Sequence, residues 1–579
     1  MELTETRIRP EHGLLIPQNP VSCQRFTRYF FIFLFGWTLV NLLQASFTQL
    51  NPDEAYYWLY AQHLDWGYFD HPPMIALFIR LGSQMLSGEL GVRLLTVLAQ
   101  SISLIFIWLT IRHWTVDRRK LILFFGIAGS IVLFDVYGFV STPDAPLLLF
   151  ESLFLWAYQK YLRSAKWSDA LLMGLFMTGM LYSKYHALLI IALIWLSNPR
   201  LFKDLKAWTA GWMALLLYAP HIWWEFQHHF PSLEYHLIDR AEPFQWQYLL
   251  EYWPNQMAAL NPFTLGLALY IFIRYRAQHV FERGLYFIAG GMLLFFWLMA
   301  LRGHVEPQWT ISAAIPMIIL IYRKAIEKPA LIRYIHRFIF PTLLLILLAR
   351  IVLIIPISFL DLPFYGHREW AAALQQITGN RPVVFMDSYQ KPSLYSFYTR
   401  RPAFTLNSID YRKNQFDIWK KEIAFHHQPC VLVSTSEDPY AQAYALSHQQ
   451  TVYLHFTRHL PTIEHIRIAF TLPVRSLHAG EIIQLPIQIY NPYPFAVNLQ
   501  NEEFPVSLNT IWIHGDDKWS MPLIAAQLPP AIDAHDTIET TIQFAVPDLP
   551  AKHVHMGISL RAGVIKPAFN SSFVSLHLQ

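Results

Sequence analysis

The chain has 579 residues, of which 54% are hydrophobic and only 15% are charged. Its mean hydropathy is +0.27, which excludes an ordinary soluble globular protein. The formal net charge is +4, and because the basic residues cluster between apolar blocks, this excess does not indicate binding to nucleic acid.

The apolar blocks have roughly the 20-residue length that a helix needs to cross the hydrocarbon of a membrane. We expect about eleven spans, at residues 29–49, 91–113, 121–141, 145–162, 168–183, 185–197, 206–223, 258–275, 284–301, 308–323 and 338–359. The polar residues 1–28 precede the first block, and no small-residue cleavage site follows it. The first block is therefore predicted to be a retained helix and not a signal peptide.

Basic residues alternate between loops in the way that the positive-inside rule requires. Arg118, Arg119 and Lys120, for example, lie in a loop that the span count places in the cytoplasm. The predicted protein is a multi-pass protein of the inner (plasma) membrane. Its amino terminus is cytoplasmic, and everything after about residue 360 is periplasmic.

Four regions follow from this topology: a cytoplasmic segment at 1–28, a membrane domain at 29–360 with an outer loop at 50–90, and two outer domains. Within the loop, the apolar segment 74–87 is about 20 Å long as a helix, so we expect it to lie along the interface. Residues 361–460 alternate helical stretches with short apolar runs, which predicts a small α/β layer. Residues 461–579 alternate in strand fashion between turns, which predicts an immunoglobulin-like β-sandwich.

The residues that suggest chemistry lie on the predicted outer side, at the ends of spans. They are Asp53 and Glu54 after the first span, Asp70 and His71 in YFDHPP, Asp144 in a Thr-Pro-Asp turn, Lys184 and His186 in another turn, His221 and His228 in a long loop, and Arg302, His304 and Glu306 in the last turn. Charged residues near a membrane are costly unless they are paired, solvated or functional.

These residue types suit transfer of a sugar from a phospholipid donor. A general base needs a carboxylate within reach of an acceptor hydroxyl, and Asp53 or Asp144 can supply it. A leaving phosphate needs a cation or a metal opposite its charge, which Lys184, Arg302 or a metal can supply. Carboxylates beside an oxocarbenium-like centre complete the set.

Five elements in this order resemble the GT-C membrane glycosyltransferases of glycosyltransferase family 39. That group includes the protein O-mannosyltransferases and, more distantly, the lipid A aminoarabinose transferases. The elements are DEAYYW, YFDHPP, TPDAPLLLF, LYSKYHALL and GHVEPQW, within about residues 30–320. Each motif alone is weakly specific, whereas the ordered set at the predicted topology is more so.

The resemblance implies a polyprenyl-phosphate-linked sugar as donor and transfer on the outer face with inversion. It places the family's acidic position of the first outer loop on Asp53, and a second acidic position on Asp144. The aminoarabinose transferases carry a Glu-Lys pair where this chain has Asp70-His71, with the acid as a metal ligand and the lysine near the donor phosphate. A divalent metal of unknown identity, held by Asp70, His221 and His228, thus stays open here, and the phosphate role passes to Lys184 or Arg302.

Each residue also has a structural interpretation. Asp53 and Glu54 are suited to capping the helix that follows, and Asp144 to capping the next span. Asp70 before two prolines is an ordinary turn residue. Lys184 can extend its charge to the interface, and the loop histidines can belong to an aromatic belt.

The sequence thus predicts an integral membrane glycosyltransferase with the catalytic residues Asp53, Glu54 and Asp144. Asp70, His71, Lys184, His186, Arg302, His304 and Glu306 are the candidate substrate-binding residues. The expected partners are the lipid-linked donor, membrane lipid, and a lipid A, glycan or protein acceptor, without nucleic acid. A lipid flippase is the alternative, disfavoured because the charges lie at span ends. An anchored surface-binding protein is a further one, but it would need a single span.

Overall fold

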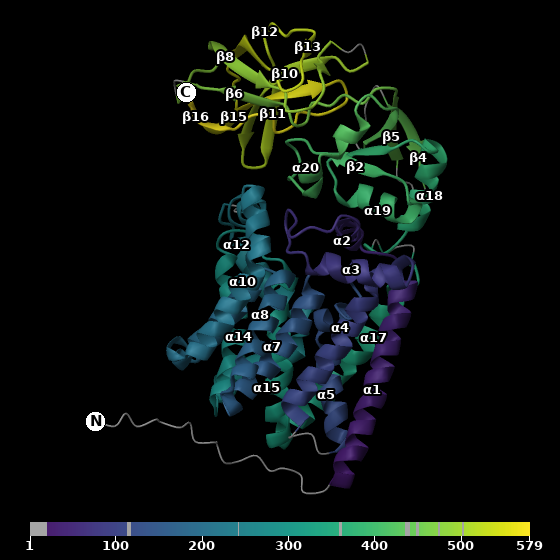
Figure 1. The fold of residues 1–579 in the computed structure, drawn as a ribbon, viewed down its shortest axis with the longest axis vertical. Coiled ribbons are helices and arrows are strands. Elements are labelled where there is room, and N and C mark those ends of the chain that lie inside the picture. The colour runs from purple at the N-terminus through teal and green to yellow at the C-terminus, as the bar shows by residue number, and fades with distance from the viewer. Residues whose placement is uncertain are drawn as a thin grey trace, which may run out of the picture. The chain divides into compact units, whose positions relative to one another are not determined.

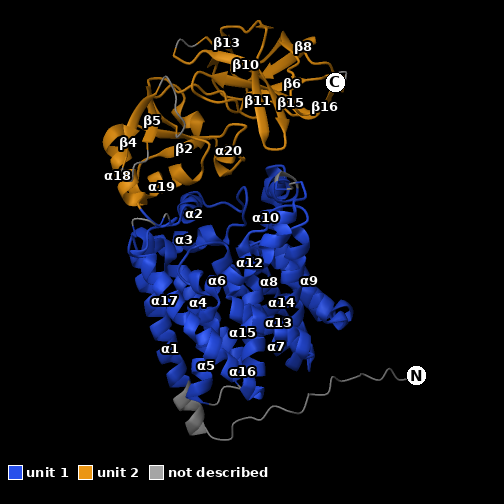
Figure 2. Ribbon diagram, turned by 180° about the vertical axis from the view of Figure 1, so that it is seen from behind, with its two compact units in different colours: residues 1–365 blue, residues 366–579 orange. Residues whose placement is uncertain are grey.

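The computed structural model describes residues 20–112, 117–240, 243–357, 360, 362–434, 441–446, 451–472, 475–500 and 503–579. The chain forms two compact units, residues 1–365 (unit 1) and residues 366–579 (unit 2), shown in separate colours in Figure 2. Residues 1–19 of the predicted cytoplasmic segment 1–28 lie outside the described residues. Unit 1 thus ends close to the predicted end of the membrane domain, and a boundary at 460 stays a prediction.

Unit 1 is helical, and Figure 1 shows its long helices running side by side. The longer helices are α1 (Pro20–Phe47), α4 (Gly88–Ile111), α5 (Arg118–Ser130), α7 (Asp144–Ser164), α8 (Trp167–Ser183), α9 (Ala187–Ser197), α10 (Leu205–Gln227), α12 (Trp246–Leu260), α13 (Pro262–Arg274), α14 (Val280–Met299), α15 (Ala314–Glu327) and α17 (Phe340–Val352). Shorter elements connect them: α2 (Pro52–Gln62), α3 (Met74–Met85), α6 (Val132–Val136), η2 (Pro199–Lys203), α11 (Pro231–Glu234), η3 (Tyr235–Asp239), η4 (Pro307–Ala313), α16 (Pro329–Tyr334) and η5 (Ile335–Ile339).

Five helical segments of the described chain are long and apolar enough to cross a membrane. They are Thr27–Phe47, Gly88–Ile111, Val280–Met299, Pro307–Glu327 and Pro329–Val352, and a sixth counts if the bent pair α12 and α13 forms one span. Several predicted spans fall short of this criterion, such as α9 with 11 residues. The protein therefore has several apolar helices of a multi-pass membrane protein, and the total of about eleven spans stays a prediction.

The span predicted at 258–275 corresponds to α13 (Pro262–Arg274), and α12 (Trp246–Leu260) precedes it in a segment predicted to be mostly loop. The chain bends by 106° between α12 and α13. Asn261 at the break has a positive φ of 68°, and Pro262 begins α13, where a proline needs no hydrogen-bond partner for its nitrogen. This local chemistry ends one helix and begins the next.

The segment predicted to lie along the interface forms α3. Its buried residues are Ile75, Ala76, Phe78, Ile79 and Gly82, and this spacing places them along one face of the helix. α3 packs against α4 and against α2, which begins the same outer loop. The loop is therefore a folded platform in which α2 and α3 have fixed neighbours.

Unit 2 begins with a five-stranded sheet in the order β2-β1-β3-β5-β4. Its strands are β1 (Val383–Met386), β2 (Ala403–Leu406), β3 (Cys430–Ser434), β4 (Gln442–Ala445) and β5 (Thr451–Thr457), with α18 (His367–Thr378), α19 (Gln390–Thr399), α20 (Gln415–Trp419) and η6 (Lys421–Phe425) in the same segment. β1 is parallel to β2 and β3, whereas β5 is antiparallel to β3 and β4. β1 and β3 are almost continuously buried, as is usual for strands in parallel pairs.

The remainder of unit 2 is rich in strands. One sheet has the order β11-β10-β15-β16-β7, a second has the order β12-β14-β8-β6, and β13 pairs with β9. The strands are β6 (Arg467–Phe470), β7 (Ser476–Leu477), β8 (Ile482–Tyr490), β9 (Val497–Asn498), β10 (Val506–His514), β11 (Asp517–Pro522), β12 (Ala525–Ala526), β13 (Ala531–Ile532), β14 (Thr537–Ala545), β15 (His553–Ala562) and β16 (Val574–Leu578). Trp512 of β10 contacts Phe544 of β14, with ring centroids 6.3 Å apart. The predicted β-rich carboxyl-terminal region is confirmed, and its description as a sandwich stays a prediction.

Candidate active site

The outer loop is fixed where α2 begins. The Asn51 side chain accepts a hydrogen bond from the Asp53 amide, at 3.0 Å, while Glu54 Oε2 accepts one from the Asn51 amide, at 2.9 Å. This reciprocal pattern is a capping box, which satisfies amide groups that a helix start leaves without partners. The capping role considered for the acidic pair therefore applies to Glu54.

Glu54 is also the partner of Arg93 from α4. Arg93 Nε donates to Glu54 Oε1 at 2.7 Å and Nη2 to Oε2 at 2.5 Å, and both side chains are fully buried. The Ser141 amide donates to Oε1 at 2.8 Å. Since both carboxylate oxygens are occupied, the geometry supports Glu54 as a positioning residue that joins the loop to α4 and to the turn before α7. Its predicted catalytic role stays a prediction.

Tyr137, in the turn after α6, has three of the predicted acids among its electrostatic neighbours. Its hydroxyl is within electrostatic range of the carboxylates of Asp144, Asp53 and Glu306. The three acids come from the start of α7, the first turn of α2 and the residue before η4, respectively. The fold thus gathers acids that are far apart in the sequence around one buried tyrosine.

Asp144 and Lys184 form an ion pair. Lys184 Nζ lies 2.7 Å from Asp144 Oδ1, and the two side chains are 8% and 4% exposed, respectively. Asp144 begins α7, and Lys184 directly follows α8, so the packing of these two helices sets the distance. A buried charge needs such a partner, because its desolvation would otherwise cost several kcal/mol.

A second group of predicted residues lies around His186, which directly precedes α9. Its electrostatic neighbours are Lys184, His236, His71 and Arg240. The His186 ring contacts the rings of Phe296 and Trp309, at centroid distances of 4.9 and 5.7 Å. Lys184 and Arg240 supply positive charge near these aromatic rings, a combination suited to an anionic group that carries an apolar chain.

Arg240 is the basic residue that the sequence did not single out for the site. Its Nη2 lies 3.1 Å from Glu306 Oε1, and its guanidinium carbon lies 4.6 Å from the centroid of the Trp309 ring. Arg302, which was predicted to hold phosphate, is exposed and has no ion pair within the described parts of the chain. His304 is half-buried beside Tyr248, with ring centroids 6.0 Å apart.

Asp70 is held within the loop. Tyr60 Oη donates to Asp70 Oδ1 at 2.8 Å, and His236 Nε2 lies 3.2 Å from the Asp70 carbonyl oxygen. Since a carbonyl only accepts, Nε2 is the donor. Burial lowers the pKa of His236, which favours the neutral ring. His71 packs its ring against Tyr57.

The predicted metal ligands Asp70, His221 and His228 do not form a group of three within 4.8 Å among the described residues, and a metal held by them stays a prediction. His221 Nδ1 lies 2.8 Å from the Trp66 carbonyl and Nε2 lies 3.1 Å from the Tyr185 hydroxyl, so both ring nitrogens have partners. His228 Nδ1 lies 2.8 Å from the Trp224 carbonyl. In the described part of the chain, one group of three potential ligands meets a 4.8 Å limit between donor atoms, and it lies in unit 2.

Some buried charges within helices escaped the sequence analysis. Arg93 of α4, Arg350 of α17 and Glu151 of α7 are buried, and Arg350 Nη1 lies 2.9 Å from Asp135 Oδ1. Each interrupts an apolar block as an isolated charge, and that signal would have identified it. The rule that charges gather at span ends is therefore incomplete for this chain.

Comparison with known proteins confirms the predicted resemblance to the GT-C membrane glycosyltransferases, whose helical fold the chain shares. Residues 70–224 match the family described as dolichyl-phosphate-mannose-protein mannosyltransferase. This segment includes Asp70, Asp144 and Lys184.

Particular relatives sharpen this assignment. The chain is 28% identical over 318 residues to the lipid A galacturonosyltransferase RgtD of Rhizobium johnstonii, a match that covers 50% of this chain and 64% of the relative. The matched part is thus less than two thirds of that relative. Crystal structures of ArnT from Cupriavidus metallidurans superpose with TM-scores of 0.53 in the apo state and 0.55 bound to undecaprenyl phosphate. Each match has 13% identity and covers 74% of this chain and 98% of the other.

Proposed function

We propose that the chain is an integral membrane glycosyltransferase that transfers a sugar from a polyprenyl-phosphate-linked donor to an acceptor on the periplasmic face, with inversion. Its amino terminus is cytoplasmic in this proposal, with about eleven spans, an outer α/β layer and a carboxyl-terminal sandwich. The relatives favour a transferase over the flippase alternative. RgtD is named for transfer to lipid A, and ArnT binds undecaprenyl phosphate.

The observation that carries the proposal is the buried Asp144–Lys184 pair. A transferase of this kind needs an anion near the acceptor and a cation near the leaving phosphate. The pair, at 2.7 Å, supplies both signs of charge in one place, and Asp53 lies within range of the same Tyr137 hydroxyl as Asp144.

In the proposed reaction, the acceptor oxygen forms a bond to the anomeric carbon while the bond from that carbon to the phosphate oxygen breaks. Asp53 takes the acceptor proton, and Asp144 stabilises positive charge on the sugar. Lys184 and Arg240 hold the departing polyprenyl phosphate. Arg240 replaces Arg302 in this role because Arg240 belongs to the charged environment of His186. The residues considered for a metal do not form a group of three within 4.8 Å among the described residues, so no step involves it.

The activity test uses purified protein in lipid discs with a panel of polyprenyl-phospho-sugars and a crude membrane acceptor. The readout is free polyprenyl phosphate. We expect release by the wild type and at least about 100-fold less from Asp53→Asn, as for loss of a general base. Asp548→Asn, which changes an exposed acid, is the matched control and should retain activity. Full release by a folded Asp53→Asn variant would remove Asp53 from the mechanism, and no release from any donor would favour lipid binding or transport.

A further inference from the structure

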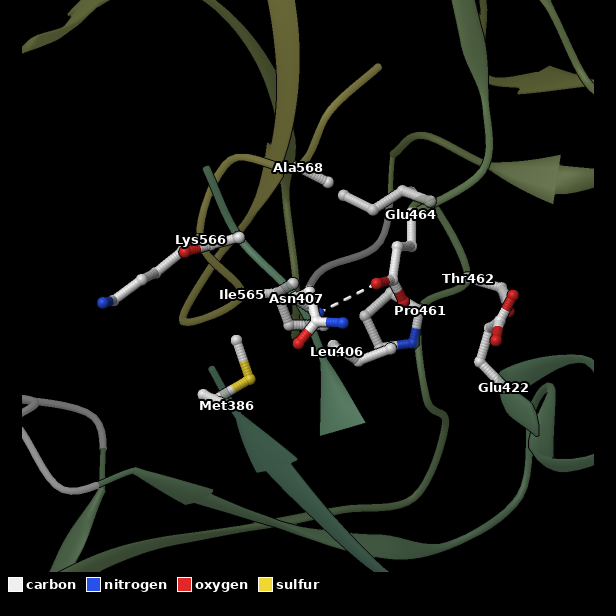
Figure 3. A pocket seen from close by; sticks show the side chains of 12 residues that line it. Met386, Leu406, Asn407, Glu422, Pro461, Thr462, Glu464, Ile565, Lys566 and Ala568 are labelled. Atoms are coloured by element: carbon white, nitrogen blue, oxygen red, sulfur yellow. Dashed lines mark hydrogen bonds between the residues drawn. The ribbon is translucent and has the colours of Figure 1, made fainter. Parts of the chain in front are cut away.

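A small cavity of about 10 Å³ lies in unit 2, away from the residues discussed so far. Figure 3 shows that Asn407, Glu422 and Glu464 line it. Asn407 follows β2, Glu422 belongs to η6, and Glu464 lies in the loop between β5 and β6. Glu464 Oε1 accepts a hydrogen bond from the Asn407 amide at 2.8 Å, so one carboxylate oxygen is fixed by the backbone.

Three potential ligands approach one another at this cavity. One donor atom from each of Glu422, Glu464 and His465 lies within 4.8 Å of the others. His465 Nε2 is 3.3 Å from Glu422 Oε1, and the Tyr493 hydroxyl also lies 3.3 Å from that oxygen. Two carboxylates and an imidazole therefore lie close together, and the two carboxylates line a cavity of the size of a single ion or water.

Two buried polar atoms here lack hydrogen-bond partners. His465 Nε2 is one, and Asn407 Oδ1 is the other. The Asn407 side chain lines the cavity and belongs to a residue that is only 3% exposed. A buried acceptor without a partner costs about 1–3 kcal/mol, and Asn407 Oδ1 is such an acceptor in a residue of the cavity wall.

The charges around the cavity favour a cation. Glu422 and Glu464 bring two carboxylates to the same group of potential ligands as the His465 imidazole. Within the described residues, neither Glu422 nor Glu464 forms an ion pair with a lysine or an arginine.

We propose that Glu422, Glu464 and His465 bind a divalent transition-metal ion of the zinc type. Imidazole nitrogen and carboxylate oxygen are ligands that zinc accepts, at about 2.0–2.2 Å. Tetrahedral ligands at that distance are about 3.4 Å apart, and His465 Nε2 and Glu422 Oε1 already lie 3.3 Å apart. The ion joins η6 of the α/β layer to the loop that leads into the β-rich region.

The experiment uses the full-length protein without a histidine tag, treated with chelator and then titrated with Zn²⁺, Mn²⁺ or Ca²⁺. Calorimetry and elemental analysis should give one zinc per chain, with weaker binding of calcium because calcium prefers oxygen ligands. Zinc at 100 times its dissociation constant should raise the ratio of folded to unfolded unit 2 about 100-fold. Tighter binding of Ca²⁺ than of Zn²⁺ would overturn the zinc assignment.

Single substitutions test the ligand set. His465→Gln and Glu464→Gln should each weaken zinc binding at least about 10-fold. His455→Gln is the matched control, because His455 also lies beside a glutamate, Glu503, at 3.4 Å, but belongs to no group of three ligands. Equal zinc binding by the wild type and His465→Gln, or absence of zinc from the wild type, would overturn the proposal. These readouts need no sugar transfer, so they are independent of the proposed function.

Discussion

The two units contain different arrangements of carboxylates. In unit 1, Glu54, Asp135, Asp144 and Glu282 each lie beside an arginine or a lysine, whereas the buried Glu151 has no ion pair among the described residues. In unit 2, Glu422 and Glu464 face each other and an imidazole. The charge of a carboxylate beside an arginine or a lysine is compensated within the chain, whereas two facing carboxylates require protons or an ion from solution. The same residue type therefore has a structural or a ligand role according to what the fold places opposite it.

Removal of Arg93 from its buried ion pair with Glu54 should have the largest effect on stability. Arg93→Met leaves the Glu54 carboxylate buried without its partner, which we expect to cost about 3–5 kcal/mol of stability. Loss of monodisperse protein after heating measures it. The double variant with Glu54→Gln should recover much of the loss, because no charge is then left unpaired. If Arg93→Met were as stable as the wild type, the pair would not hold the loop.

The next prediction compares Arg240 with Arg302 as the residue that contacts the phosphate. Arg240→Gln should lower sugar transfer about 100-fold if the guanidinium contacts the charge that develops on the phosphate. Arg302→Gln should change it less than about 2-fold, since exposed charges contribute little. Initial rates with saturating acceptor measure both. A reversed order of effects would return the phosphate role to Arg302.

A packing change tests how closely the outer loop fits α10. A Cβ atom added at Gly67 would lie 2.4 Å from Trp224 Cε3, so Gly67→Ala should cost about 1–3 kcal/mol through overpacking. Gly211→Ala, within α10 itself, is the control because a Cβ atom added there meets nothing within 4 Å. Thermal midpoints of the two variants should separate clearly. Equal midpoints would show that the loop shifts freely against α10.

The smallest expected effect concerns the accessibility of the Cys430 thiol in unit 2. Cys430 in β3 is fully buried, and burial raises the pKa of its thiol to about 12. In a Cys23→Ser background, a maleimide at pH 7 should label it only after unit 2 opens. Saturating zinc should slow this labelling further if the ion binds the closed form. Rapid labelling of the native protein would show that β3 is accessible.

The sequence predicted the helices well where polar turns bound them. α7 and α8 begin within one residue of their predicted starts, because Thr-Pro-Asp and the basic loop before Trp167 interrupt the apolar pattern. Helix α12 was missed, since its sequence alternates apolar and polar residues and was assigned to a long loop before the span that α13 forms. The order of strands in each sheet was also beyond reach, because pairing depends on contacts distant in sequence.

The sequence identified several residues of the candidate site, but not which of them contact one another. Asp144 and Lys184 were both named, but their pairing is set by helix packing across 40 positions of sequence. His221 and His228 suggested metal because histidine is a common ligand, yet each has a ring nitrogen beside a backbone carbonyl, of Trp66 and Trp224 respectively. Glu422 and Glu464 gave no signal, because only the folded chain brings η6 to the loop between β5 and β6.

The bonds of Glu54 impose an order on synthesis. Its arginine partner is 39 residues later in the chain, and the amide of Ser141 is 87 residues later. At ribosomal rates of 5–20 residues per second, the carboxylate waits roughly 4–17 s before its last partner exists. During that interval α2 can form its capping box but lacks the hydrogen bonds to Arg93 and Ser141. Chaperones or the insertion machinery therefore encounter the first outer loop before the segments that fix its position have been synthesised.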